Sequence, residues 1–89
     1  MWILTINGKE DEGAYSVTNE YGNQVLYIFE EEDDAIRFAM MLEDLDSPEM
    51  HVIEVDENLL IRTCNNYQYN YTIITKDDLV IPPEHYDYV

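Results

Sequence analysis

Apolar and polar residues follow β-type patterns along the first third of the chain. Trp2 to Ile6 is bulky and β-branched, and the polar stretch 7–13 after it predicts a loop. Ala14 to Thr18 alternates apolar and polar residues, 19–23 has turn chemistry, and Gln24 to Phe29 resumes an apolar run. These patterns predict one strand followed by a β-hairpin.

The next segment has the spacing of an amphipathic helix. The helix is expected to begin in the acidic run 30–34 and to continue to about Asp46, where Ser47 and Pro48 stop it. Apolar residues recur there every three or four positions, and this stripe predicts the face that packs on the core. Its members are Ala35, Phe38, Ala39, Leu42 and Leu45, widened by Met41.

The second half predicts a strand, a helix and a strand. Met50 to Val55 is a short strand, Asp56 is placed to cap a helix of roughly 57–65, and Tyr67 to Thr75 is rich in strand-forming residues. Asparagine tolerates the left-handed conformation that closes helices, so Asn65 and Asn66 are expected to end the helix. Its inward face would carry Leu60, Ile61 and Cys64. Residues 79–81 are expected to be extended and residues 85–89 to be loose.

The predicted element order is therefore β-β-β-α-β-α-β in a single α+β domain, residues 1–89. Parallel strands need helical crossovers, and we expect both helices to cover one face of a single mixed sheet. A two-layer sandwich, ferredoxin-like or a close variant, is the favoured fold. Eighty-nine residues leave no room for a second core, and 46% hydrophobic residues are too many for a disordered acidic chain.

Net charge changes the functional picture more than any motif does. Twenty acidic residues face only four lysines and arginines, which gives a formal charge of -16. Nucleic acid and anionic membranes are polyanions, so we expect neither as a direct partner. A basic protein surface is the electrostatically natural partner, and homo-oligomerisation is compatible with this reading.

The acids are concentrated in the middle of the chain. Twelve of the 20 lie between Glu30 and Glu57, where Arg37 alone opposes them. The first turn of a helix favours one or two acids, whereas five contiguous carboxylates repel one another. If both helices share one sheet face, this segment should form a one-sided negative field. The predicted partner-binding residues are Glu30, Glu31, Glu32, Asp33, Asp34, Glu43, Asp44 and Asp46.

Motifs for metal binding and catalysis are missing from the sequence. The segment 44–49 lacks the glycine and the later glutamate of a calcium loop, and the single cysteine and two histidines lack zinc-module spacing. Cys64 lies on an apolar stripe, and His51 reads as a structural histidine rather than a base. With three glycines there is no phosphate-binding loop. We therefore expect no catalytic residues, no cofactor and no dedicated metal site.

The expected location is a reducing, cytoplasm-like compartment. The first residues lack the basic leader and long apolar run of a signal peptide, and the lone Cys64 forms no internal disulfide. No stretch approaches the roughly 20 apolar residues of a membrane span.

Four segments together suggest a known family. They are 1–4 (MWIL), 12–17 (EGAYSV), the run 25–43 (VLYIFEEEDDAIRFAMMLE) and 81–84 (IPPE). In these the chain resembles a small cyanobacterial and plastid family, domain of unknown function 3110. The resemblance implies an oxygenic phototroph or its phage and a soluble protein, and it transfers no catalytic residues.

Three functions of different classes follow as hypotheses. The first is a non-enzymatic adaptor that docks a basic surface of a larger protein, and the family resemblance implies that this protein belongs to photosynthesis. The second is a DNA mimic that inhibits a nucleic-acid-binding protein, because 16 charges equal the phosphate charge of about 27 Å of duplex. The third is a small metal-dependent enzyme or cation-binding protein.

Overall fold

The computed structural model describes residues 1–45, 47–78, 82 and 86–88. The predicted α+β order is confirmed through the fifth strand, and the described residues add a short 3-10 helix and a sixth strand. The elements are β1 (Trp2–Ile6), η1 (Glu10–Glu12), β2 (Tyr15–Thr18), β3 (Gln24–Phe29), α1 (Glu32–Asp44), β4 (Met50–Glu54), α2 (Glu57–Asn66), β5 (Asn70–Ile74) and β6 (Tyr86–Tyr88).

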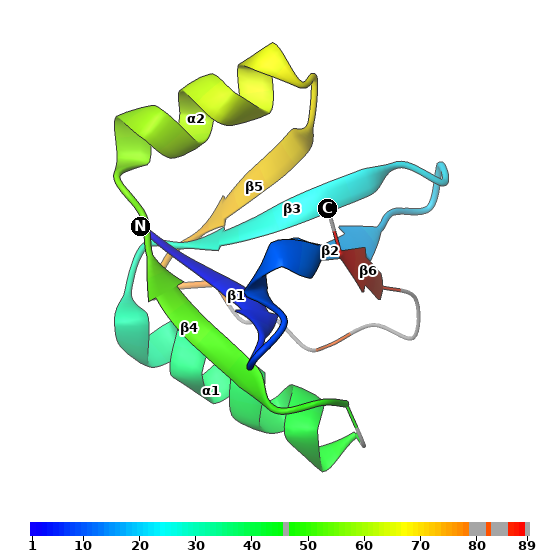
Figure 1. Cartoon of the computed structure of the whole chain (residues 1–89), viewed down its shortest axis with the longest axis vertical. Helices are drawn as coiled ribbons and strands as arrows, with labels where there is room; N and C mark the ends of the chain where they lie inside the picture. Colours follow the sequence, from blue (N-terminus) through cyan, green and yellow to red (C-terminus); the bar gives the residue numbers. More distant parts are fainter. Residues whose placement is uncertain (46, 79–81, 83–85, 89) are drawn as a thin grey trace.

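The strands form one mixed sheet in which β3, β4, β5 and the short β6 run in the same direction. Its order is β4-β1-β3-β2-β6, and β5 pairs with β3. β1 is antiparallel to both β3 and β4, so β3 and β4 are parallel to each other, and β5 is parallel to β3. The predicted β2–β3 hairpin is confirmed, with Ser16 opposite Leu26. Figure 1 shows the arrowheads of β3, β4 and β5 directed toward the side of the molecule where the N-terminus lies.

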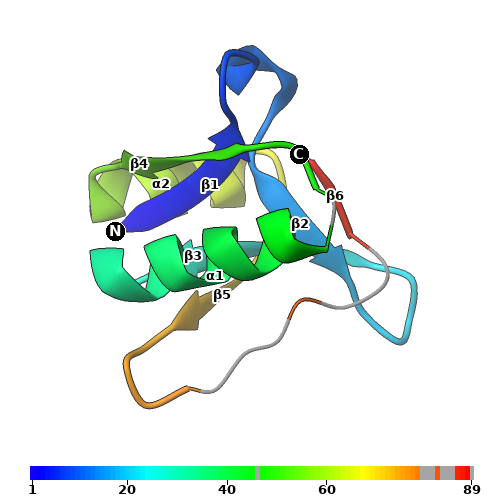
Figure 2. The same cartoon turned by 90° about the horizontal axis from the view of Figure 1, so that it is seen from below.

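The two helices pack on opposite faces of this sheet. In β3, Leu26 and Ile28 belong to the cluster that α2 covers, whereas Tyr27 and Phe29 belong to the cluster that α1 covers. Successive strand residues point to opposite faces, so the two clusters are two separate cores. Figure 1 shows α2 and α1 on either side of the strands, and Figure 2 shows the same separation from below. The prediction of both helices on one face is therefore wrong, and a ferredoxin-like sandwich is not confirmed.

The reason lies in the direction of the two crossovers. The connection β3-α1-β4 crosses β1 in one direction, and the connection β4-α2-β5 returns past β1 and β3. Crossovers between parallel strands are right-handed in nearly all proteins. When the direction of travel reverses while the strands stay parallel, the second helix has to lie on the other face. The hydrophobic pattern of a helix alone does not show which face of the sheet the helix covers.

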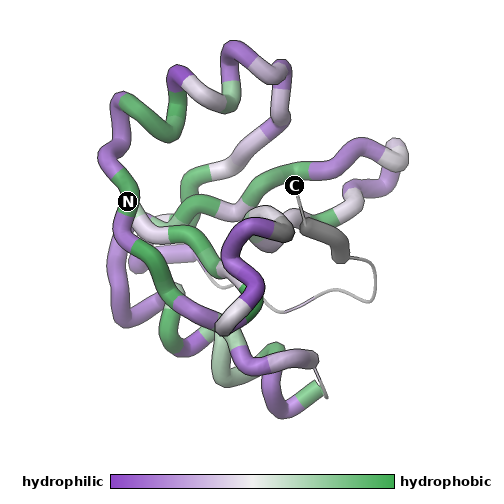
Figure 3. Tube along the Cα trace, viewed as in Figure 1, coloured by the Kyte–Doolittle hydropathy of each residue, from purple (hydrophilic) through white to green (hydrophobic). Residues whose placement is uncertain are grey.

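The α1 core confirms most of the predicted stripe. Ala35, Phe38, Ala39 and Leu42 are buried, and Phe38 packs its ring 5.4–5.7 Å from the rings of Tyr15, Phe29 and Tyr27. Leu45 is 62% exposed, so its predicted place in the core is wrong. Helix α1 ends at Asp44, and Leu45 caps it outside the helical turn that would have carried it inward. Figure 3 shows apolar positions along the strands and recurring in both helices.

Helix α2 begins as predicted and ends later than predicted. The Asp56 carboxylate accepts a hydrogen bond from the Leu59 N–H at 2.9 Å, which confirms the cap. Asn65 and Asn66 remain helical, and Gln68 takes the left-handed conformation with φ 58°. The Tyr69 N–H donates to the Cys64 carbonyl and the Gln68 N–H to the Asn65 carbonyl, which is the Schellman closure of a helix. Strand β5 therefore starts at Asn70 instead of Tyr67.

Replacing Gln68 with glycine is expected to stabilise the protein. A side chain in the left-handed region costs roughly 1–2 kcal/mol, and glycine removes that cost while adding freedom to the unfolded chain. We expect Gln68→Gly to raise the free energy of unfolding by about 0.5–1 kcal/mol. Urea denaturation measures this, and Arg62→Gly, in the exposed middle of α2, is the opposite control because it should lose about 0.8 kcal/mol. A loss of stability in Gln68→Gly would contradict this account of the helix end.

The end of the chain corrects one expectation and leaves another open. Residues 86–88 were expected to be loose, and they form β6, which pairs antiparallel with β2. The extended segment expected at 79–81 lies outside the described residues. Among the residues described, no helix is long and apolar enough to cross a membrane.

Candidate functional site

Acidic side chains gather where the three parallel strands end. Strands β3, β4 and β5 run in one direction, so their carboxyl ends share one edge of the sheet. Met1 lies at the same edge because β1 runs the opposite way, and Figures 1 and 2 both show the starts of α1 and α2 beside it. We name this the carboxyl edge; its acids are Glu30, Glu31, Glu32, Asp33, Asp34, Glu54, Asp56, Glu57, Asp77 and Asp78.

Few cations oppose these ten acids. In the part of the chain that the structure describes, Arg37, Lys76 and the Met1 amine lie beside them, and Arg37 is held by Asp34 at 3.0 Å. The second oxygen of Asp34, Oδ2, is buried without a hydrogen-bond partner. The surface is hollowed at two places, one lined by Glu31, Asp33, Asp34, Arg37 and Lys76 and one by Met1 and residues 54–57. The carboxyl edge therefore keeps a large negative excess.

Two helix starts hold part of this charge in place. Glu32, Asp33 and Asp34 lie in the first turn of α1, and Glu57 lies in the first turn of α2. Acids at this position gain about 0.3–1 kcal/mol each from the helix dipole. Glu31 is the N-cap residue of α1 and shares this interaction, whereas Glu54 and Asp77 lie outside both helices and their caps. Their repulsion is a cost that the fold itself does not repay.

The structure brings together five of the eight predicted partner-binding residues. Residues 30–34 all lie at the carboxyl edge. Glu43 and Asp44 lie at the far end of α1, which is 13 residues or about 20 Å long, and Asp46 lies outside the described residues. The expected single negative flank on one sheet face is therefore wrong, because the helices lie on opposite faces.

The predicted partner-binding residues did not include Asp77 and Asp78, nor Glu54, Asp56 and Glu57, although the last three were counted among the acids of the segment 30–57. Glu54 ends β4, Asp56 and Glu57 come after it, and Asp77 and Asp78 come shortly after β5. The signal in the sequence was the repeated occurrence of acids at or shortly after the end of an apolar strand. These acids meet at one edge only because the strands are parallel. The order of elements along the chain does not show whether two strands are parallel.

His51 and Glu10 form a side-chain hydrogen bond on the α2 face of the sheet. The His51 Nδ1 lies 3.0 Å from the Glu10 Oε1, and the Gly8 N–H donates to the same oxygen at 3.1 Å. Backbone hydrogen bonds from Glu10 itself and Gly8, and then His51, lower the pKa of Glu10. The pair is exposed and pins the η1 loop against β4, so His51 has a structural contact, as predicted.

A mostly apolar cleft of about 290 Å³ separates part of α2 from the sheet. Ile3, Leu26 and Ile53 line its floor, Leu60 and Cys64 line its helical wall, and Glu10 and Tyr69 are at its rim. Burial raises the pKa of the Cys64 thiol, which keeps it protonated and makes it a poor nucleophile. The cleft thus shows no activated group.

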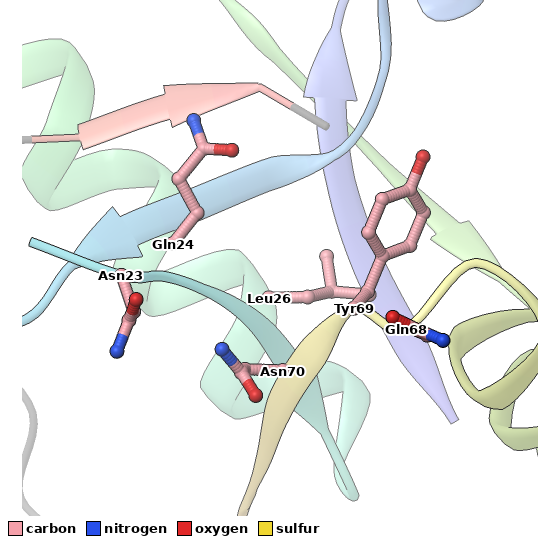
Figure 4. Close-up of a pocket in the computed structure, with 6 residues that line it drawn as sticks. All are labelled: Asn23, Gln24, Leu26, Gln68, Tyr69 and Asn70. Carbon is pink, nitrogen blue, oxygen red and sulfur yellow. The ribbon is translucent and has the colours of Figure 1, made fainter.

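A hollow at the starts of β3 and β5 is lined by amides and a tyrosine. Figure 4 shows Leu26 between Asn23 and Gln24 on one side and Gln68 and Tyr69 on the other, with Asn70 nearby, around a hollow of about 190 Å³. The rings of Tyr67 and Tyr69 stack at 5.7 Å, and Tyr67 is 68% exposed. Acids also lie at this end of the molecule, among them Glu20 in the β2–β3 turn, Glu43 and Asp44 at the end of α1, and Glu49 directly before β4.

Within the described residues, no group of three or more histidine, cysteine, aspartate or glutamate side chains is arranged to hold a metal ion. The carboxyl-edge acids come from separate segments and spread over a surface.

Comparison with known proteins places the chain in a family. No curated protein and no solved structure matches it. Residues 1–84 match the family described as Domain of unknown function (DUF3110), and this stretch contains the carboxyl edge and every helix of the fold. The chain therefore belongs to the DUF3110 family.

Proposed function

We propose that this protein is a non-enzymatic adaptor domain that docks a basic surface of a larger protein through the carboxyl edge. One observation carries the proposal: three parallel strands deliver ten acids to the same edge, where only Arg37, Lys76 and the Met1 amine oppose them among the described residues. A negative surface of this kind raises the association rate of cationic partners and rejects anionic ones.

The acids are better explained by binding than by folding. Exposed like charges destabilise the compact state, and a cationic partner would relieve that cost. Lysine or arginine side chains of a partner supply the opposite charge and form charge-assisted hydrogen bonds with exposed carboxylates.

The resemblance to a cyanobacterial and plastid family suggests the setting. We propose that the partner is a photosynthetic or assembly component and that the protein works in the cytoplasm or stroma. The function of the family is unassigned, so the partner has to be identified by experiment.

Charge-neutralised baits provide the test. The carboxyl-edge variant combines Glu30→Gln, Glu31→Gln, Glu54→Gln and Asp77→Asn, none of which lies in a helix. The matched control combines Glu20→Gln, Glu43→Gln, Asp44→Asn and Glu49→Gln, and it removes the same four charges elsewhere. We expect wild type and control to retain a basic protein from a phototroph lysate at low salt. The carboxyl-edge variant should retain at least tenfold less of that protein.

Salt and DNA separate the alternatives. Retention should fall steeply when the ionic strength is raised to about 0.5 M, because exposed charges are then screened within a few ångströms. Equal retention by all three baits would refute docking at the carboxyl edge. If the retained protein were released by duplex DNA, the DNA-mimic hypothesis would replace the adaptor. Melting temperatures of the three baits verify that each is folded.

A further inference from the structure

Among the described residues, strand β5 has one paired edge and one edge without a strand partner, which we call the open edge. It pairs with β3 alone, and no second strand adjoins it in the part of the chain that the structure describes. The Glu30 N–H donates to the Ile74 carbonyl at 2.9 Å, so Ile74 directs its backbone groups toward β3. Backbone direction alternates along a strand. The N–H and C=O groups of Tyr71 and Ile73 therefore point away from β3.

The open stretch is bounded at both ends. At one end the Tyr69 N–H donates to the Cys64 carbonyl. At the other end the Thr75 N–H donates to the Asp78 carboxylate at 2.8 Å, and the Asp78 N–H donates to the Thr75 carbonyl. The open stretch is thus the length of strand that Tyr71 and Ile73 span, with its neighbours already satisfied.

This edge lacks the protection that edge strands usually carry. Natural proteins guard such edges with charged residues, prolines or bulges. The sequence of β5, Asn-Tyr-Thr-Ile-Ile, contains no charge and no proline, although the chain carries 20 acids. Edge strand β4, by contrast, ends in Glu54, directly follows Glu49 and carries His51. An unguarded edge in so acidic a protein is a template for strand addition.

We propose that the open edge of β5 accepts an extended segment of the partner as an added β-strand. This inference rests on the proposed function and names the part of the partner that binds. Tyr71 and Ile73 are half-buried in the α2 core, so the added strand would place apolar or β-branched side chains on that face at alternate positions. β5 leads into Asp77 and Asp78 of the carboxyl edge, so the segment carries lysine or arginine at that end.

A second copy of this chain is a poor occupant of the edge. Each copy brings a net charge of -16, and pairing two β5 strands would bring two sets of acids together. A neutral strand with a basic end matches both the uncharged edge and the negative field beside it.

The test uses a defined peptide and a pair of variants at one position. The probe is a fluorescent peptide of alternating valine and threonine with two lysines at one end, made in both orientations. Its control has the same sequence with alternate backbone amides N-methylated, which keeps the charge and removes the donors. Ile73→Pro removes the outward N–H and leaves the hydrogen bonds between β5 and β3 intact. Ile73→Ala is the matched control, because it shortens the same side chain and keeps the N–H.

We expect saturable binding of one orientation to wild type and to Ile73→Ala. Ile73→Pro lacks one strand hydrogen bond and adds a proline ring at the edge, so it should bind the peptide about tenfold more weakly or worse. N-methylation of the peptide should weaken binding by a similar factor. The amides of Tyr71 and Ile73 should gain hydrogen-exchange protection in the complex. Thermal melting verifies that Ile73→Pro is as folded as Ile73→Ala.

Two results would overturn the inference. Equal binding of the methylated and unmethylated peptides, or of the proline and alanine variants, would mean that only charge is recognised. Absence of saturable binding in either orientation would also end it. Neither result affects the adaptor proposal, which fails separately if the carboxyl-edge variant still retains the basic partner from lysate.

Discussion

Phe38→Ala should remove about 3–5 kcal/mol from the free energy of unfolding, since truncating a buried phenylalanine costs transfer energy and leaves a cavity. Phe38 is fully buried, and its ring lies 5.4 Å from the ring of Tyr15 and 5.5 Å from that of Phe29. Phe38 therefore makes the main packing contact of α1 with β2 and β3. Because small domains are stable by about 5–15 kcal/mol, this loss is a large fraction of the total, and the variant should unfold at a clearly lower urea concentration than wild type.

Urea denaturation followed by circular dichroism measures this effect. Met40→Ala is the control, because Met40 is on the same helix and 59% exposed. We expect it to change stability by less than about 0.5 kcal/mol. If Phe38→Ala lost under 1 kcal/mol, the aromatic cluster would not be the main anchor of α1.

The local elements of the fold were predictable because each has its own periodicity. The bounds of β1 and β3 agree with the predicted ones, and the stripe of α1 is confirmed from Ala35 to Leu42. Errors at the helix ends came from the local closing geometry, which spacing alone does not fix. Leu45 fits the stripe by spacing, yet the helix ends before it. Helix α2 ends at Asn66, but the left-handed residue that closes it is Gln68 and not an asparagine.

The sheet face that each helix covers could not be predicted from the hydrophobic pattern of that helix alone. It depends on whether the chain travels back across the sheet, and on whether the strands that it links are parallel. The same unknown limited the candidate site. Residues 30–34 stood out as a run, whereas Asp77 and Asp78 become part of the site only because β5 is parallel to β3.

Leu60→Ala tests the second core and should cost about 2–4 kcal/mol, a usual range for a buried leucine. Leu60 and Cys64 are the only buried residues of α2, so this helix is attached by a small area. We expect the α2 amides to lose hydrogen-exchange protection before those of α1. Leu59→Ala is the control, because Leu59 is 55% exposed on the same helix.

The double variant Leu42→Ala, Leu60→Ala decides whether the two cores are independent. Leu42 packs beneath α1 and Leu60 beneath α2, on opposite faces of the sheet and without shared neighbours. Losses at such sites add to within about 0.5 kcal/mol. A coupling energy well above that value would mean that both residues belong to one core, as the single-face arrangement requires. If the losses are additive and the α2 amides exchange early, the α2 face opens on its own, beside the half-buried side chains of Tyr71 and Ile73. Helix α1 and the acids at its start would then keep their positions.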